Sequence, residues 1–164
     1  MESEIWKTIS DYPNYEVSDS GRVRRIGAEK CLAPIANSNG YLLVHLYKVG
    51  GPKIIRIHRL VALAFVANPD NKMFVDHINR VKTDNRVSNL RWATASENRV
   101  NSSTKSKSGY RGVSKHRNRF QSQIRINNKL IHLGLYETPE EAAIIYDAAA
   151  IDAFGEFATL NFPE

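Results

Sequence analysis

The 164-residue sequence has a single cysteine, Cys31, and no long apolar segment. One thiol cannot form an internal disulfide, and zinc sites built on paired cysteines are excluded as well. The longest apolar run, residues 60–67, is far shorter than the roughly 20 residues that a membrane-spanning helix needs. The first four residues are acidic and polar, which is unlike a signal peptide. We therefore expect a globular protein of the cytoplasm without a membrane partner.

Charges of one sign are missing from two adjoining stretches. Residues 101–135 hold eight Lys and Arg side chains and no acid, whereas residues 136–164 hold seven acids and no base. The net charge of the whole chain is +6. A basic stretch that faces a polyanion would explain this separation, which favours nucleic acid as the partner. The alternative is a solvated surface whose bases pair with the neighbouring acids.

The sequence divides into four parts. Residues 1–52 contain short strand-like pieces between Gly and Pro turns, and residues 53–100 begin with a strand followed by a helix from 58 to 66. Residues 101–109 have no side chain that could join a core, which predicts a flexible basic linker. Residues 110–164 form the last part. We expect an α+β protein with a β-rich N-terminal module, a central domain, a linker and a C-terminal domain.

The C-terminal part predicts three strands and one helix. The strands are expected at 111–115, 119–126 and 130–136. Asn127-Asn128 suits a two-residue hairpin turn with positive φ, and Thr138 to Glu141 reads as a helix capping box with proline at the first helical position. Small residues along this helix predict packing on one face of a three-stranded antiparallel sheet. The other face carries the bases and is the expected DNA surface.

Asp76, His77 and Asn98 have the side chains that phosphodiester hydrolysis requires. A carboxylate and an amide oxygen can ligate a hard cation when water and phosphate complete its shell. A histidine titrates near neutrality and can take a proton from the attacking water. Because adjacent strand residues point to opposite sides, Asp76 and His77 can share one site only where the backbone is irregular. Taken singly, an Asp-His dipeptide is more often a turn or a surface pair.

The motifs between His58 and Asn98 together resemble the HNH nuclease motif of phage and intron-encoded homing endonucleases. The matching stretches are HRLVALAF at 58–65, VDHIN at 75–79, NRVSNLRWAT at 85–94 and SEN at 96–98. The resemblance implies a ββα-metal core around one divalent cation, Mg²⁺ or Mn²⁺. It implies Asp76 and Asn98 as metal ligands, His77 as general base, and Asn89 as the residue that orients this histidine.

The loop after His77 departs from the family pattern. Members commonly have Asp-Gly where this chain has Asn79-Arg80, which questions the tight turn but not the catalytic set. We expect Arg80 to add a phosphate contact, and an unchanged affinity after Arg80→Ala would count against this.

The N-terminal part resembles the nuclease-associated module that precedes HNH domains in homing endonucleases. The stretches that carry the resemblance are EIWK at 4–7 and YEVSDSGRVR at 15–24. Arg22 and Arg24 could make this module a second DNA-contact surface. The alternative is a purely structural lid on the nuclease.

The C-terminal part resembles the plant APETALA2/ethylene-response DNA-binding domain, which reads the major groove with its sheet. The matching residues are YRGV at 110–113, FQSQIR at 120–125, HLGLY at 132–136, TPEEAA at 138–143 and YDAAA at 146–150. By position, the resemblance implies base contacts by Arg111, Arg119 and Arg125, and phosphate contacts by Lys115, Arg117 and Lys129. A tryptophan and other contact residues of the plant first hairpin are missing, so the target sequence does not carry over.

The resemblances together imply a site-specific homing DNA endonuclease of a bacterial or phage-infected cell. It would act on double-stranded DNA as a monomer, and since one HNH site attacks one strand at a time, nicking is favoured. One alternative is a DNA-binding regulator whose nuclease has decayed, which the intact set of Asp76, His77, Asn89 and Asn98 disfavours. The second alternative is an RNA-binding protein, which fits the charge distribution but not the resemblance of the C-terminal part.

Overall fold

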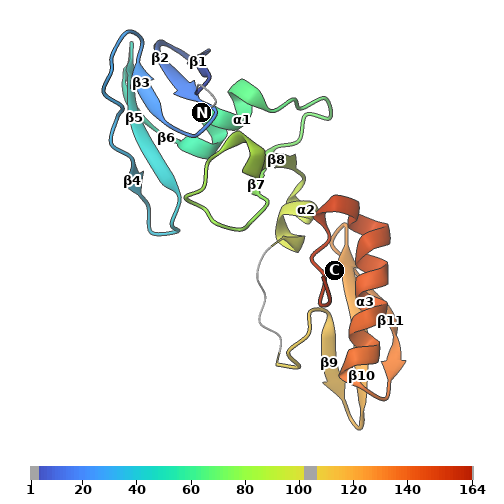
Figure 1. Ribbon diagram of the computed structural model, residues 1–164. Helices are drawn as coiled ribbons and strands as arrows, with labels where there is room; N and C mark the ends of the chain where they lie inside the picture. The colour runs from blue at the N-terminus through green and yellow to red at the C-terminus, as the bar shows by residue number, and fades with distance from the viewer. Residues whose placement is uncertain (1–3, 102–106, 164) are drawn as a thin grey trace. The chain divides into compact units, whose positions relative to one another are not determined.

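The computed structural model describes residues 4–101 and 107–163 and contains two compact units (Figure 1). The first unit covers residues 1–93 and the second covers residues 94–164. The division lies ahead of the linker expected at 101–109, of which residues 102–106 lie outside the described residues. The first unit therefore joins the N-terminal module to the two strands expected for the nuclease core. No helix in the part described is long and apolar enough to cross a membrane.

Two small antiparallel sheets open the first unit. One has the order β1-β2-β3, with β1(Trp6–Ile9), β2(Tyr12–Ser18) and β3(Val23–Arg25). The other has the order β4-β5-β6, with β4(Ile35–Ala36), β5(Leu42–Lys48) and β6(Gly51–Arg56). The strand-like sequences at 22–26, 41–47 and 53–57 form β3, β5 and β6, with bounds that differ by up to two residues.

Helix α1(Ile57–Phe65) follows β6 without a loop and buries one face. Its buried residues Ile57, Leu60 and Val61 join a core with Val17 of β2 and Leu46 of β5, whereas Leu63 on the opposite face is 65% exposed. The apolar spacing thus produces the amphipathic helix that the sequence predicts. The helix ends at Phe65, and the carbonyl of its C-cap residue Val66 accepts a hydrogen bond from the Trp92 indole at 3.0 Å.

A two-stranded antiparallel ribbon completes the first unit. It consists of β7(Phe74–His77) and β8(Leu90–Ala93), joined by a loop that contains the 3-10 turn η1(Val87–Asn89). The register places Asp76 opposite Arg91 and His77 opposite Leu90. Val75, Leu90 and Trp92 are buried in the same core as α1, so the ribbon is held against that helix.

The second unit is a three-stranded antiparallel sheet packed on one helix, as predicted. The sheet has the order β11-β10-β9, with β9(Val113–His116), β10(Arg119–Ile126) and β11(Lys129–Tyr136). Asn127 and Asn128 have φ of 47° and 65°, which is the conformation of a type I′ turn. Helix α3(Pro139–Phe154) lies along the sheet (Figure 1), and the turn η2(Gly155–Phe157) follows it.

The helices of the second unit begin at capping boxes. Thr138 accepts from the Glu141 amide and Glu141 reaches back to the Thr138 amide, which confirms the predicted start of α3. Helix α2(Ala95–Val100) begins in the same way with Thr94 and Glu97. Each box satisfies amide groups that the first helical turn leaves unpaired.

Small residues allow α3 to approach the sheet closely. Ala142 and Ala143 are fully buried against Val113. Gly112 has φ of +73°, and a Cβ there would collide with the Tyr146 ring and lie 2.7 Å from the Gln123 carbonyl oxygen. The glycine is therefore required both by its conformation and by the space available.

A buried carboxylate ties the C-terminal segment to α3. Asp147 is 7% exposed and accepts hydrogen bonds of 2.9 Å from the Asn161 amide, the Asn161 side chain and the Phe162 amide. The Asn161 carboxamide also pairs with both backbone groups of Arg111 ahead of β9. The Asn161 side chain therefore links the C-terminal segment both to α3 and to the residues just before β9.

We expect Asp147→Ala to destabilise the second unit by about 3 kcal/mol or more, because three partly buried donors lose a charged acceptor. Calorimetry would measure the loss, and hydrogen exchange at Asn161 and Phe162 would accelerate. Asp152→Ala, which removes an exposed carboxylate of the same helix, should change stability by less than about 0.5 kcal/mol. Equal effects of the two substitutions would contradict this prediction.

Candidate functional site

His77 ends β7 and is held by a buried carboxamide. The residue is 5% exposed, and its Nε2 atom lies 3.1 Å from Oδ1 of Asn85, which is 4% exposed. Burial lowers the pKa of His77, while the hydrogen bond to Asn85 and the charges of Asp76 and Asp84 oppose this shift. A histidine that is neutral near pH 7 can accept a proton. Sequence reasoning missed Asn85 as a site residue, although it belongs to the stretch that carries the HNH resemblance.

Asp76 reaches a different partner from its neighbour. Its Oδ2 accepts from Nε of Arg91 at 3.0 Å across the β7–β8 ribbon, and the two side chains are 6% and 14% exposed. Alternation along a strand explains why Asp76 meets β8 while His77 meets Asn85. The chain turns at once after His77, where the Arg80 amide donates to the His77 carbonyl at 2.9 Å. The strand is regular at Asp76 and His77, and the irregular backbone begins only with the turn that follows His77.

Asn89 fastens the loop that follows His77. Its Oδ1 accepts from the Asn79 amide at 2.9 Å, and its Nδ2 donates to the Asp84 carbonyl at 2.8 Å. These contacts close the loop from which Asn85 reaches the histidine. The resemblance implies that Asn89 orients His77, which stays a prediction, and the two hydrogen bonds of its side chain go to the loop backbone.

The tight turn that the family forms with Asp-Gly is retained without glycine. Arg80 is exposed and occupies the left-handed region with φ of 63°. Asn79 supports it, since its Oδ1 accepts from the Val81 amide at 2.8 Å and its Nδ2 donates to Asp84 at 2.8 Å. The side chain of Asn79 thus supplies bonds that stabilise a turn with an unfavourable φ.

The N-terminal module packs directly on this loop. Gly21, in the turn between β2 and β3, has φ of +84°, and a Cβ there would lie 2.7 Å from the Cβ of Asn85. The Asp19 carbonyl accepts from the Val87 amide at 2.7 Å. The module therefore helps to fix the residue that contacts His77.

A second histidine lies beside the first. The rings of His58 and His77 are edge to face with centroids 5.0 Å apart, and the Tyr41 ring lies 5.1 Å from His58 and 6.0 Å from His77. His58 is 4% exposed, and its Nδ1 is buried without a partner among the residues described. Burial, and then the charges of His77, Arg56 and Arg59, lower the pKa of His58 to about 3. His58 is therefore neutral at physiological pH.

Asn98 lies on α2, in the second unit, and is half-buried. Within the described residues, no three His, Cys, Asp or Glu side chains gather into a metal site. The pair predicted from the sequence, Asp76 and Asn98, offers one carboxylate and one carboxamide oxygen. Such hard oxygen donors fit Mg²⁺ or Mn²⁺, which keep several positions for water and phosphate.

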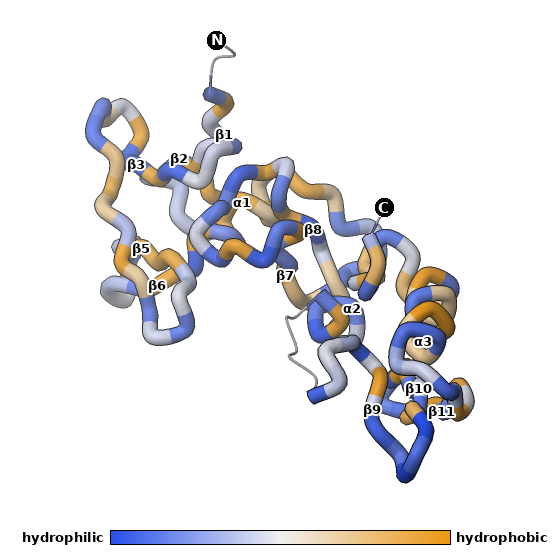
Figure 2. Tube along the Cα trace, turned by 60° about the horizontal axis from the view of Figure 1, so that its bottom comes forward, coloured by the Kyte–Doolittle hydropathy of each residue, from blue (hydrophilic) through white to orange (hydrophobic). Residues whose placement is uncertain are grey.

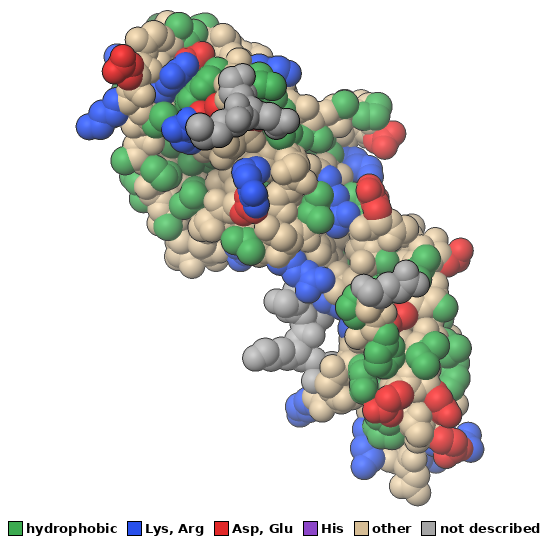
Figure 3. All heavy atoms as spheres, in the orientation of Figure 1, with side chains coloured by type: hydrophobic (Ala, Val, Ile, Leu, Met, Phe, Trp, Pro, Cys, Tyr) green, Lys and Arg blue, Asp and Glu red, His purple; other side chains and the backbone are tan. Residues whose placement is uncertain are grey.

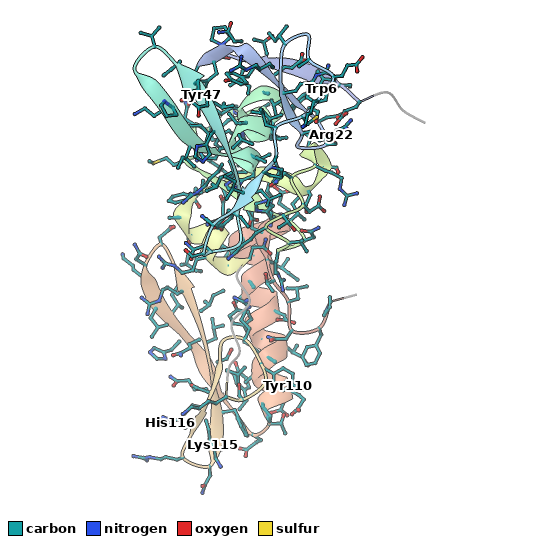
Figure 4. All side chains as sticks on the ribbon, turned by 90° about the vertical axis from the view of Figure 1, so that its left-hand side faces the viewer. Trp6, Arg22, Tyr47, Tyr110, Lys115 and His116 are labelled. Atoms are coloured by element: carbon teal, nitrogen blue, oxygen red, sulfur yellow. The ribbon has the colours of Figure 1, made fainter. Side chains whose placement is uncertain are left out.

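The arginines of the N-terminal module have partners within it. Arg22 pairs with Glu4, and Arg24 lies 2.6 Å from Glu16. Both guanidinium groups lie over the Trp6 ring, at 5.7 and 3.8 Å from its centre, and Figure 4 shows Trp6 beside Arg22. A DNA contact by either arginine would compete with a carboxylate.

The free face of the second unit's sheet carries two of the predicted base-reading residues. Arg119 and Arg125 alternate with the buried Ser122 and Ile124 along β10, so their side chains point away from α3. Arg119 pairs with Glu137 at 2.8 Å, and both side chains are exposed. The predicted alternation of faces along β10 is confirmed by the burial of its residues.

The other predicted contacts of this unit lie away from that face. Lys115 is paired with Phe120 and Lys129 with Ile126, so each lysine is on the side of the sheet that α3 covers. Arg117 is exposed in the turn that follows β9, next in sequence to His116. Figure 4 labels Lys115 and His116 at the end of β9. Figure 2 shows this turn as strongly hydrophilic.

Arg111 precedes β9, and its side chain interacts with Tyr146 of α3. Burial raises the pKa of Tyr146 on α3, and the charge and hydrogen bond of Arg111 lower it. The acids of the unit gather over α3 (Figure 3), as the sequence predicts.

Comparison with known proteins identifies two segments of the chain. Residues 56–100 match the HNH endonuclease family, and residues 4–47 match the NUMOD4 motif. An uncharacterized HNH endonuclease of Acanthamoeba polyphaga mimivirus is 49% identical over 105 residues, which are 58% of this chain and 25% of that protein.

A solved structure extends the likeness to the fold. The HNH homing endonuclease I-HmuI of Bacillus phage SP01, studied for DNA binding and cleavage, has a TM-score of 0.51 and 38% identity. The match covers 57% of this chain and 53% of that chain. The α+β fold with an HNH core is thereby confirmed.

The C-terminal segment has relatives of another kind. An AP2-like ethylene-responsive transcription factor of Arabidopsis thaliana is 49% identical over 59 residues, which are 34% of this chain and 17% of that protein. The chain spans between 17% and 53% of the length of these relatives.

We expect His58 to make the first unit less stable as the pH falls. Its pKa is about 6.5 in the unfolded chain and about 3 in the fold, so the unfolded chain binds the proton first. The contribution of neutral His58 to the free energy of unfolding is complete above pH 6.5. It is lost from there toward pH 3, at up to about 1.4 kcal/mol per pH unit. Urea unfolding followed by fluorescence of Trp6 and Trp92 would measure it. His58→Leu should flatten the slope, whereas the exposed His45→Leu should leave it unchanged.

We expect Asn85→Ala to lower the pKa of His77 further. The carboxamide oxygen accepts a hydrogen bond from the protonated ring and so favours the charged form, and its loss leaves burial less opposed. An NMR titration of the imidazole C–H signals would report the change. Ser88→Ala, an exposed position of the same loop, serves as the control. An unchanged His77 pKa in Asn85→Ala would show that the contact does not form in solution.

Proposed function

We propose that this chain, whose residues 56–100 match the HNH endonuclease family, is a site-specific DNA endonuclease of the homing type. Homing endonucleases are among its homologues, which supports a nuclease in general terms. The observation that carries the proposal is the buried His77 at the end of β7, with a lowered pKa and its ring held by Asn85. A fixed, neutral imidazole next to a carboxylate suits hydrolysis of a phosphodiester bond.

Each residue of the site has a distinct role in this reaction. His77 accepts the proton of the attacking water, and Asn85 keeps the imidazole in place during the transfer. Arg91 holds the Asp76 carboxylate through their ion pair. Asp76 and Asn98 would hold one divalent cation, Mg²⁺ or Mn²⁺, which when bound neutralises charge on the phosphate and the leaving oxygen.

The second unit would select the DNA site. Arg119 and Arg125 lie on the free sheet face, where bidentate contacts to guanine in the major groove are feasible. Arg117 would contact a phosphate from the turn after β9. Lys115 and Lys129 lie on the side that α3 covers and would reach phosphates only past the edges of the sheet. Arg111 would have to leave Tyr146 to meet a base. The similarity to AP2-like plant transcription factors supports this role.

Contacts from the first unit would add to affinity without reading sequence. Arg80 is exposed beside His77 and would meet a phosphate near the cut. Arg22 and Arg24 would contribute where DNA displaces Glu4 and Glu16. Because a single HNH site attacks one strand at a time, we propose that the protein acts as a monomer and nicks one strand of double-stranded DNA. Its proposed setting is a bacterial or phage-infected cell.

The competing function is a DNA-binding regulator without nuclease activity. The presence of Asp76, His77, Asn89 and Asn98 argues against it, since a protein that only binds DNA has no need of a neutral, buried base. The ion pair of Asp76 with Arg91 and the loop bonds of Asn89 also remain in place.

The test is incubation of supercoiled plasmids with random inserts, using wild-type protein, His77→Ala and the exposed His45→Ala. We expect nicked product with Mg²⁺ or Mn²⁺, none with EDTA, a loss on the order of 10²-fold or more in His77→Ala, and full activity in His45→Ala. Salt-sensitive duplex binding without a metal-dependent nick, on a pool that contains the target, would favour the regulator instead.

A further inference from the structure

The Tyr41 ring brings two cations together beside the candidate base. Tyr41 directly precedes β5, Arg56 is the last residue of β6, and Lys82 lies in the loop after β7. The Arg56 guanidinium lies 5.4 Å and the Lys82 ammonium 5.0 Å from the centre of the Tyr41 ring. Three separate parts of the first unit thus converge on one aromatic side chain.

This cluster lies next to His77. The Tyr41 and His77 ring centres are 6.0 Å apart, and His58 fills the space beside both rings. His58 carries no charge at neutral pH, so the positive charge beside Tyr41 comes from Arg56 and Lys82.

Arg56 and Lys82 have no carboxylate partner among the described residues. Other arginines of the unit are paired, as Arg24 is with Glu16 and Arg91 with Asp76. Lys82 donates to the Asn39 carbonyl at 3.0 Å, which fixes its position without neutralising it. Both cations are exposed, so an anion can reach them.

We propose that Arg56 and Lys82, held against the Tyr41 ring, form a phosphate-binding subsite for the DNA strand that passes His77. The subsite would take backbone phosphates on one side of the bond to be cut, and Tyr41 acts as the positioning residue. Cation–π contact restricts both side chains, so less freedom is lost when they meet the phosphate. The proposal rests on the proposed DNA endonuclease function and names a strand contact for it.

Phosphate fits this cluster better than a stacked base. The ring that would stack with a base already contacts the protein's own cations. The two charges instead match the charge of a nucleic acid backbone. A flexible surface lysine elsewhere would lack both the ring and the fixed hydrogen bond.

The salt dependence of DNA affinity tests the two cations without requiring cleavage. Full-length wild type, Arg56→Ala, Lys82→Ala and the double variant would be titrated with a mixed-sequence duplex in EDTA. Each phosphate contact contributes about 0.9 to the log–log slope. From 50 to 200 mM salt, the wild type should therefore lose about 12-fold more affinity than the double variant, and about 3.5-fold more than either single variant. Lys53→Ala, an exposed lysine of the same strand as Arg56, should behave as the wild type.

The role of Tyr41 is tested by two substitutions. Its hydroxyl makes no hydrogen bond among the residues described, so Tyr41→Phe should keep the wild-type salt slope. Tyr41→Leu removes the ring and should lower the slope and the affinity at 50 mM salt. Fluorescence of Trp6 and Trp92 would confirm that each variant is folded. Equal slopes in the Phe and Leu variants would overturn the positioning role.

The outcomes separate this subsite from the nuclease itself. A reduced slope in the double variant supports the subsite even where no plasmid is nicked. An unchanged slope in the double variant, with a wild type that nicks DNA, would overturn the subsite and leave the nuclease intact. A wild type that binds no duplex at 50 mM salt would overturn both.

Discussion

The buried hydrogen bond between His77 and Asn85 is the contact on which the arrangement of the first unit depends. Buried polar groups destabilise a fold unless they are paired, so each of these side chains constrains the other. Asn85 also packs against Gly21, where the turn leaves no room for a Cβ, and the Asp19 carbonyl binds the same loop at Val87. The N-terminal module is therefore part of the packing around the histidine. This explains why a separate motif in the sequence forms one compact unit with the β7–β8 ribbon.

Local carboxylates decide which basic residues of this chain can meet a polyanion. Arg24 and Arg91 are engaged by acids within hydrogen-bonding distance, so DNA would have to replace existing ion pairs there. Arg119 has an acid partner as well, but both side chains are largely exposed and the pair contributes little. Counting lysines and arginines along the sequence locates the basic stretch, whereas only the fold shows which of them are neutralised.

The second unit could be predicted closely from its sequence because local signals there agree with the fold. Alternation along β10, paired asparagines in the hairpin and the capping box at Thr138 each specify one element, and the structure confirms all three. The site in the first unit was harder to predict from the sequence, because it depends on contacts between distant segments. The HNH resemblance pointed to Asp76 and His77, yet the ring contact of Asn85 and the packing of Tyr41 on His58 have no periodic signature. The faces of Lys115 and Lys129 likewise required the strand register.

The turn after His77 shows how one departure from a family pattern can be accommodated. A non-glycine residue in the left-handed region costs about 1–2 kcal/mol, and Arg80 occupies that region with φ of 63°. Asn79 offsets this cost with hydrogen bonds to Val81 and Asp84, and Asn89 fixes its backbone from the other side. Glycine would relieve the strain but would remove an exposed cation beside the histidine. The proposed phosphate contact of Arg80 would give this strained backbone a functional reason, because strain is expected to persist at functional sites.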